Sequence, residues 1–177
     1  MPVIIIPDST PPVCRRIITL AQSDIPIIEN PPSSNRSPEI DGFCKEFGVP
    51  LASYWCALWT AHVWREAGAQ IPPVNNAKGW HPAICETWRQ WAFETGRFTS
   101  KPAHGYAVLY GTGGNAPAHH IGCCVVAVPR SAPHVYDLEG NTSETGFSRN
   151  GELTELKRVD LERLIGYVSP LPLPVAA

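Results

Sequence analysis

The sequence lacks a strong excess of charge of either sign. It holds 14 lysine and arginine residues against 16 aspartate and glutamate residues, so its formal net charge is -2. Proteins that bind nucleic acid or anionic membranes through their overall field carry a marked basic excess or a basic patch, and neither is visible here. The composition therefore predicts no nucleic-acid partner and no anionic lipid surface as a partner.

Long hydrophobic runs are also missing. No stretch approaches the roughly 18 apolar residues that a membrane span needs. The apolar start, residues 1–7, is too short for a secretory signal and has no basic segment before it. We therefore expect no membrane span and no signal peptide. A protein of this kind is made in the cytoplasm, and it acts elsewhere only after release or delivery.

The six cysteines do not indicate a disulfide framework, although their number is even. A chain of 177 residues with 44% hydrophobic side chains is long enough to form one domain around its own core. Cys123 and Cys124 are sequence neighbours, which would rarely pair with each other. We expect most of these thiols to be small buried hydrophobic groups.

Proline clusters mark the two ends of a single domain. Residues 1–12 contain four prolines and predict an extended N-terminal arm. Residues 169–177 contain three and predict a flexible tail. The sequence has no internal repeat, so we expect one catalytic or binding domain over residues 13–168.

Hydrophobic spacing predicts helices first and strands afterwards. Helices are expected over residues 13–22, 38–47, 54–67 and 83–95. The second should begin after a Ser37 cap and end at Gly48, and the third should begin after a Ser53 cap. Strands are expected over residues 106–110, 120–128, 135–138, 153–159 and 165–168. This order is typical of an α+β domain with an antiparallel sheet.

A candidate nucleophile lies near the start of the third predicted helix. With Ser53 as the cap, Cys56 falls in the first turn, where the positive end of the helix lowers the pKa of a thiol. The alternative interpretation is a buried core cysteine between Trp55 and Leu58.

Two histidines stand where a glycine-rich loop enters the most apolar strand. Side chains alternate along a strand, so only one of His119 and His120 can face the helix. Gly122 and Cys124 share the face of His120, and such small residues would let a helix pack close. The alternative is an ordinary surface or core histidine.

A catalytic histidine needs a third group that fixes its ring. Asp137, Glu139 and Asn141 lie two residues apart and share a face if their strand continues; otherwise they form a polar strand end. A zinc site built from His119, His120, Cys123 and Cys124 competes with this interpretation. Alternation sends these four side chains to opposite faces, so we expect no metal and no cofactor.

Three short segments together resemble the CHAP family of peptidoglycan hydrolases, which are relatives of the NlpC/P60 cysteine peptidases. The segments are YWCALW at residues 54–59, HHIG at 119–122 and EGNT at 139–142, in the order that the family shows. Ser34-Asn35-Arg36 is similar to a feature of phage and prophage members. The resemblance covers residues 30–168 and implies a papain-like fold, with N-terminal helices packed on an antiparallel sheet.

The resemblance also implies roles for individual residues. Cys56 would be the nucleophile, His120 the base, and Glu139 and Asn141 the orienting groups. The chain departs from the family at residues 104–106, where His-Gly-Tyr replaces a frequent Gly-Asp. We expect the substrate groove to be formed by aromatic and polar neighbours: Tyr54, Trp55, Trp59, Trp80 and His119.

The function implied is cleavage of amide bonds in bacterial peptidoglycan by a monomer, as an endopeptidase or an N-acetylmuramoyl-L-alanine amidase, in phage lysis. A protein without a signal peptide would reach the cell wall or periplasm after release or delivery. The alternatives are a secreted antibacterial amidase effector, an acyltransferase with the same fold, and a non-catalytic wall-binding or phage structural module.

Overall fold

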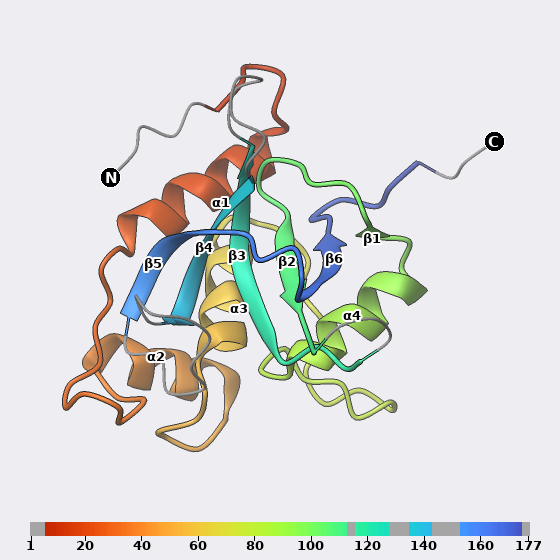
Figure 1. The fold of residues 1–177 in the computed structure, drawn as a ribbon. Coiled ribbons are helices and arrows are strands. Elements are labelled where there is room, and N and C mark those ends of the chain that lie inside the picture. Colours follow the sequence, from red (N-terminus) through yellow and green to blue (C-terminus); the bar gives the residue numbers. More distant parts are fainter. Residues whose placement is uncertain (1–5, 113–115, 128–134, 143–152, 175–177) are drawn as a thin grey trace.

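The helices precede the strands along the chain (Figure 1). The structure is a computed structural model that describes residues 6–112, 116–127, 135–142 and 153–174. The helices are α1 (Pro12–Ser23), α2 (Pro38–Phe47), α3 (Cys56–Glu66) and α4 (Cys85–Glu94). The strands are β1 (Phe98–Thr99), β2 (Ala107–Tyr110), β3 (His120–Ala127), β4 (Val135–Thr142), β5 (Leu153–Arg158) and β6 (Leu164–Val168). They form an antiparallel sheet in the order β1-β6-β2-β3-β4-β5. The predicted α+β class is confirmed.

The start and end of α2 follow the local rules of helix capping. The Ser37 hydroxyl oxygen accepts a hydrogen bond from the Ile40 N–H at 3.2 Å, and Pro38 occupies the first helical turn. Gly48 ends the helix in the left-handed region at φ 67°. Both signals were readable in the sequence, and the predicted bounds of this helix are correct.

The other predicted elements shift by a few residues. The third helix starts at Cys56 and not at residue 54, and β4 continues to Thr142 instead of ending at residue 138. The short β1 was not predicted, because two residues are too few to show an alternation. Val128 and most of the predicted polar turn, residues 142–151, lie outside the described residues.

The predicted arm and tail both contact the domain where the structure describes them. In the arm, Ile6 packs against the core and Thr10 is buried. In the tail, the N–H groups of Ser169 and Leu173 donate hydrogen bonds to the carbonyls of Arg97 and Gly96. Residues 1–5 and 175–177 lie outside the described residues.

Helix α3 is the central helix of the fold. It packs against β3 and β4, and α1 and α2 flank it (Figure 1). Its tryptophans enter the core, where Trp64 meets Trp88 of α4 edge to face at 5.1 Å between ring centroids. Ile121 and Leu138 contribute to the same core from β3 and β4. This packing fixes the first turn of α3 relative to the strands that it covers.

A search of the described helices for a bilayer-crossing segment, long and apolar throughout, finds no candidate.

Candidate active site

The start of α3 differs from the prediction in a way that matters for Cys56. Ser53 does not cap the helix, because its hydroxyl donates to the Pro50 carbonyl at 2.7 Å instead. Trp55 occupies the cap position, and its side chain accepts no hydrogen bond from the N–H groups of the helix. Cys56 is therefore the first residue of the helix, and no side chain caps the N–H groups of the first turn. The positive end of the helix dipole faces the thiol directly.

The Cys56 thiol is buried among groups that favour its ionised form. Its pKa lies well below the ordinary value, first because the Cys85 thiol donates a hydrogen bond to its sulfur. Burial opposes this shift, but the positive charge and hydrogen bond of His120 and the backbone N–H of Ile121 also lower the pKa. Cys56 and His120 are 64 residues apart in the sequence, and the packing of α3 on β3 brings them together.

His120 is held between Cys56 and the carboxylate of Glu139. Its Nε2 lies 3.3 Å from Glu139 Oε2, and its ring stacks against Tyr110 with 5.9 Å between centroids. Burial alone would lower the pKa of the imidazole. The negative charges of Cys56 and Glu139, with hydrogen bonds to both, outweigh burial and raise that pKa to about 10. A thiolate and an imidazolium are therefore the favoured forms at neutral pH.

Glu139 stays ionised although it is almost completely buried. Burial raises the pKa of its carboxyl group, but the charge and hydrogen bond of His120 and the charge of Lys157 bring it below the ordinary value. The Thr142 hydroxyl donates a further hydrogen bond to Oε2 at 2.9 Å. Lys157 Nζ in turn donates to the Thr142 hydroxyl at 3.1 Å. The carboxylate is thus fixed by three neighbours.

Asp137, two residues before Glu139 on β4, has the opposite charge state. Burial first, and then the negative charge of Glu139, raise the pKa of Asp137 well above the ordinary value. Tyr110 donates its hydroxyl hydrogen to Oδ2 at 2.9 Å, and a hydrogen bond with Glu139 also raises the pKa of Asp137. Of the two carboxyl groups, Asp137 therefore holds a proton more readily, and the negative charge is favoured on Glu139.

The glycine of the HHIG segment makes room for a carboxyl group and not for a helix. A Cβ on Gly122 would lie 2.0 Å from Asp137 Oδ2. Its neighbours Ile121 and Cys123 are the residues that enter the core cluster with α3. The prediction that the small residues on the face of His120 let a helix pack close is wrong for Gly122, and the side chain of Cys124 lies outside the described residues.

The EGN segment contains a bulge in β4. Pairing with β5 shifts between Glu139 and Thr142, and Asn141 adopts φ 53°. A Cβ on Gly140 would lie 2.9 Å from the rings of both Trp55 and Trp59, so this glycine lets α3 approach the strand. Asn141 is buried, and its Oδ1 has no hydrogen-bond partner among the described residues. The carboxylate of Glu139, and not this amide oxygen, pairs with the His120 ring.

Cys85 is a site residue that the sequence analysis missed. It begins α4 just as Cys56 begins α3, and the two Sγ atoms lie 3.8 Å apart. The pKa of Cys85 is raised well above the ordinary value, first by its hydrogen bond to Cys56 and then by burial. A second cysteine at a second helix start was visible, but nothing in the sequence indicates that the two starts meet.

Glu86 is a second residue that was missed, and it holds the segment that leads into β3. Its Oε2 accepts a hydrogen bond from the Ala118 N–H at 2.8 Å. Its carboxylate is itself fixed by Arg89, with the shortest contact at 2.5 Å, and by Gln90 at 3.2 Å. Since Ala118 lies two residues before His120, α4 helps to set where β3 begins.

The predicted groove residues separate into core and surface. Trp55 and Trp59 are fully buried, and their indole N–H groups donate to Glu29 and Asp24. They belong to the core, so the prediction that they line a groove is wrong. Trp80 is also mostly buried, beneath Lys78, and donates to Gln90. Tyr54, with 52% of its surface exposed, and His119 are open to solvent.

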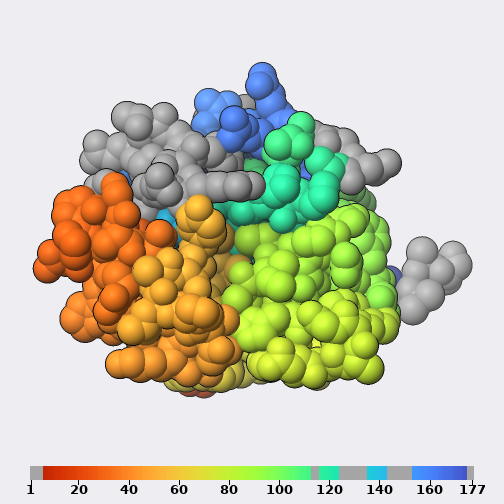
Figure 2. All heavy atoms as spheres, turned by 90° about the horizontal axis from the view of Figure 1, so that it is seen from below, coloured from red at the N-terminus to blue at the C-terminus, as the bar shows by residue number. Residues whose placement is uncertain are grey.

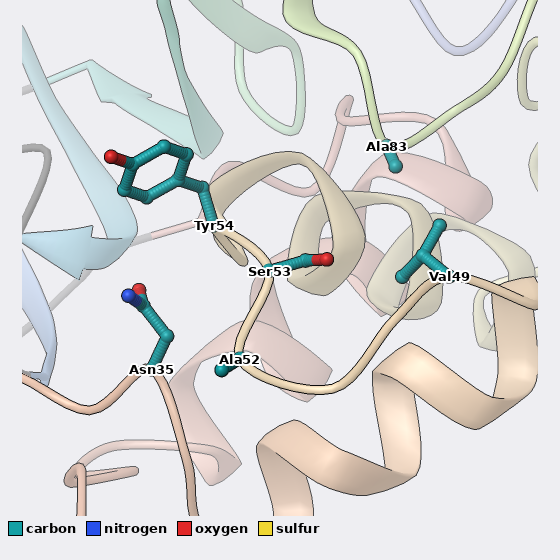
Figure 3. Close-up of a pocket in the computed structure, with 6 residues that line it drawn as sticks. All are labelled: Asn35, Val49, Ala52, Ser53, Tyr54 and Ala83. Carbon is teal, nitrogen blue, oxygen red and sulfur yellow. The ribbon is translucent and has the colours of Figure 1, made fainter.

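A pocket of about 440 Å³ lies beside the segment that leads into α3 (Figure 3). The close-up shows Ser53 in its middle, and the lining residues are Asn35, Val49, Ala52, Ser53, Tyr54 and Ala83. From below, the residues before α3 and those before α4 meet along a seam, under the residues that enter β3 (Figure 2). Tyr54 is the one predicted groove residue in this lining.

Metal ligands do not gather in the part of the chain that the structure describes. No group of three or more histidine, cysteine, aspartate or glutamate side chains there is arranged to hold an ion. The competing zinc site required Cys124, whose side chain is outside that part. The chemistry that the described site can perform is nucleophilic attack by a thiolate.

Comparison with protein-family models, with curated proteins and with solved structures finds no match for the chain.

Proposed function

We propose that this protein is a papain-like cysteine hydrolase that cuts amide bonds of bacterial peptidoglycan. The observation that carries the proposal is the buried series of Cys56, His120 and Glu139, in which the thiol pKa is lowered and the imidazole pKa is raised. Perturbation of this kind, produced by specific charge partners, is typical of a nucleophile and its base. An ordinary core cysteine has no charged partner.

The first chemical step is attack by Cys56 sulfur on the carbonyl carbon of a substrate amide. The oxyanion that forms lies next to the start of α3, whose first N–H groups have no side-chain cap. His120 then gives its proton to the leaving amine, so the C–N bond breaks and an acyl-enzyme remains. With Nε2 directed at Glu139, Nδ1 is the ring nitrogen left for this transfer.

The second step releases the acyl group. His120, now neutral, takes a proton from water, and the resulting hydroxide attacks the thioester carbonyl. The thiolate of Cys56 leaves, and the imidazolium is restored. Glu139 keeps the ring oriented and stabilises its positive charge in both steps. Asn141 stays in the proposal as an orienting group only through the resemblance of the EGNT segment, since no contact with His120 supports it among the described residues.

Support for the substrate comes from sequence resemblance and not from geometry. The three CHAP-like segments contribute Cys56, His120 and Glu139, and these are the residues that form the buried series. The pocket beside Tyr54 offers room for part of a peptide stem, next to the segment that leads into α3. We place the reaction in phage lysis, on a cell wall that the enzyme reaches after release.

The test is digestion of purified sacculi by wild type and by Cys56→Ala. New amino termini, identified by mass spectrometry, are expected with wild type and not with the variant. Cys44→Ala, which removes a buried thiol of α2 outside the Cys56–His120–Glu139 series, is the matched control and should digest like wild type. A new terminus on L-alanine indicates an amidase, and one inside the stem indicates an endopeptidase.

Equal binding of wild type and Cys56→Ala to sacculi, with no products from either, would contradict the proposal. That outcome favours a wall-binding module. Products that carry an added amine instead of a free carboxyl group favour an acyltransferase.

A further inference from the structure

Two buried thiols face each other in the site, and the proposed hydrolysis uses only one of them. Cys56 and Cys85 are the first residues of α3 and α4, with 3.8 Å between their sulfur atoms. Only 6% of the surface of Cys56 and 8% of that of Cys85 is exposed. Neither helix has a side-chain cap hydrogen bond at its start. The pair is close, and no capping side chain holds either helix start in place.

We propose that Cys85 is a resolving cysteine: when a hydroperoxide oxidises Cys56, Cys85 closes a disulfide with it and so stops the enzyme reversibly. The consequence for activity rests on the proposed function. The chemistry of the pair does not, because it needs only the two sulfur atoms and the oxidant.

The first step is oxidation of Cys56 alone. Its thiolate attacks the O–O bond of the hydroperoxide and becomes a sulfenic acid, while the other oxygen leaves with the bonding electron pair as hydroxide or alkoxide. The different charge states of the two thiols select Cys56 for this step. Its pKa is lowered by the hydrogen bond from Cys85 and by His120, whereas the pKa of Cys85 is raised.

The second step joins the two residues. Oxidation removes the negative charge from Cys56, and this charge is one of the causes that raise the pKa of Cys85. Cys85 can then lose its proton, and its sulfur attacks the sulfenic sulfur. Hydroxide leaves and combines with a proton to give water. Overall the peroxide gains two electrons and the two thiols lose two.

The geometry requires only a small movement. The sulfur atoms must approach by about 1.8 Å, from 3.8 Å to the roughly 2.0 Å of a disulfide. Both cysteines keep a small exposed fraction, and the pocket lies beside the segments that lead to them, since its lining includes Ser53 and Ala83. A disulfide would leave no thiolate for acyl transfer, and it would protect Cys56 from irreversible oxidation to the sulfinic acid.

The experiment treats the reduced full-length protein with equimolar hydrogen peroxide and measures its intact mass and peptide map. We expect wild type to lose two hydrogens, to yield one cross-linked peptide pair that contains Cys56 and Cys85, and to return to its starting mass with dithiothreitol. Cys85→Ala should instead gain oxygen at Cys56. Cys44→Ala, which lacks a different buried thiol, should cross-link like wild type.

Oxygen added to Cys56 of wild type without a cross-link, or no reaction at all, would overturn the proposal. Cys85→Ser, which nearly preserves the shape of the side chain, serves if the alanine variant does not fold, and wild-type mapping stands without either variant. The mass measurement needs no turnover. A cross-link in a protein that leaves sacculi uncut therefore refutes the hydrolase alone, and digestion of sacculi without a cross-link refutes the resolving cysteine alone.

Discussion

Helices α2 and α3 begin in opposite ways, although they pack against each other. At α2, the Ser37 hydroxyl accepts from a first-turn N–H, and Pro38 suits the first turn. At α3, the cap position holds Trp55, whose side chain makes no capping hydrogen bond, and the first helical residue is Cys56. The first start stabilises the fold. The second leaves backbone donors open beside a nucleophile, as a site that must bind a developing negative charge requires.

The same contrast extends to the strands beneath α3. In the described part of β4, Asp137 Oδ1 and Asn141 Oδ1 are both buried without a hydrogen-bond partner. Buried polar atoms are nearly always paired in folded proteins, and exceptions cluster at functional sites. The start of α3 and these two oxygens of β4 thus differ from the start of α2, which follows the capping rules. Three kinds of substitution test whether this difference reflects function.

The largest effect is expected at the histidine that completes the α3 site. His120→Ala removes the base and the positive charge that stabilises the thiolate, so turnover on sacculi should fall by about 10³-fold or more, roughly 4 kcal/mol in activation free energy. His119→Ala, one residue earlier and exposed, is the control and should stay close to wild type. The measurement is the initial rate of release of new termini.

A large loss in His119→Ala together with normal turnover in His120→Ala would move the base to the other histidine. It would also weaken the interpretation of the uncapped start of α3, because that interpretation relies on His120 as the base beside Cys56.

A smaller effect, with a defined pH dependence, is expected at the neutral acid on β4. The pKa of Asp137 is raised in the folded protein, so its carboxyl stays protonated there and ionises on unfolding. The stability that it contributes is complete below the unfolded pKa of roughly 4 and is lost as pH rises toward the folded pKa. In that interval, the unfolding free energy of wild type should fall through this group as pH rises.

Asp137→Asn removes this titration and keeps the shape of the side chain. Its unfolding free energy, measured by urea titration between about pH 5 and pH 8, should therefore rise relative to that of wild type as pH increases. Parallel curves for the two proteins would mean that Asp137 is ionised in the fold. In that case β4 would carry two buried negative charges, on Asp137 and Glu139. Asp137 would then no longer distinguish the site around α3 from the start of α2.

The sequence predicts the parts of the molecule that depend on neighbours in the chain. The cap and stop of α2 and the α+β order of elements follow from short segments, and the resemblance of three such segments named Cys56, His120 and Glu139, which the fold brings together. The face of Gly122, the burial of Trp55 and the contact between Cys56 and Cys85 do not. Each depends on which elements meet in space. Ser53 illustrates the limit: the residue type suits a cap, but the turn after Pro50 gives its hydroxyl another acceptor.

The smallest expected effect compares the two serines directly. Ser37→Ala removes a cap that is present, so it should lower the unfolding free energy by about 1 kcal/mol. Ser53→Ala removes a hydroxyl that caps nothing and bonds only to a turn carbonyl, so it should change the unfolding free energy by no more than about 0.5 kcal/mol. Urea titrations under one set of conditions measure both changes.

If the two variants lost equal unfolding free energy, or if Ser53→Ala lost more, the start of α3 would be stabilised through its serine after all. The open N–H groups would then no longer distinguish the helix that bears the nucleophile from the helix that only supports the fold.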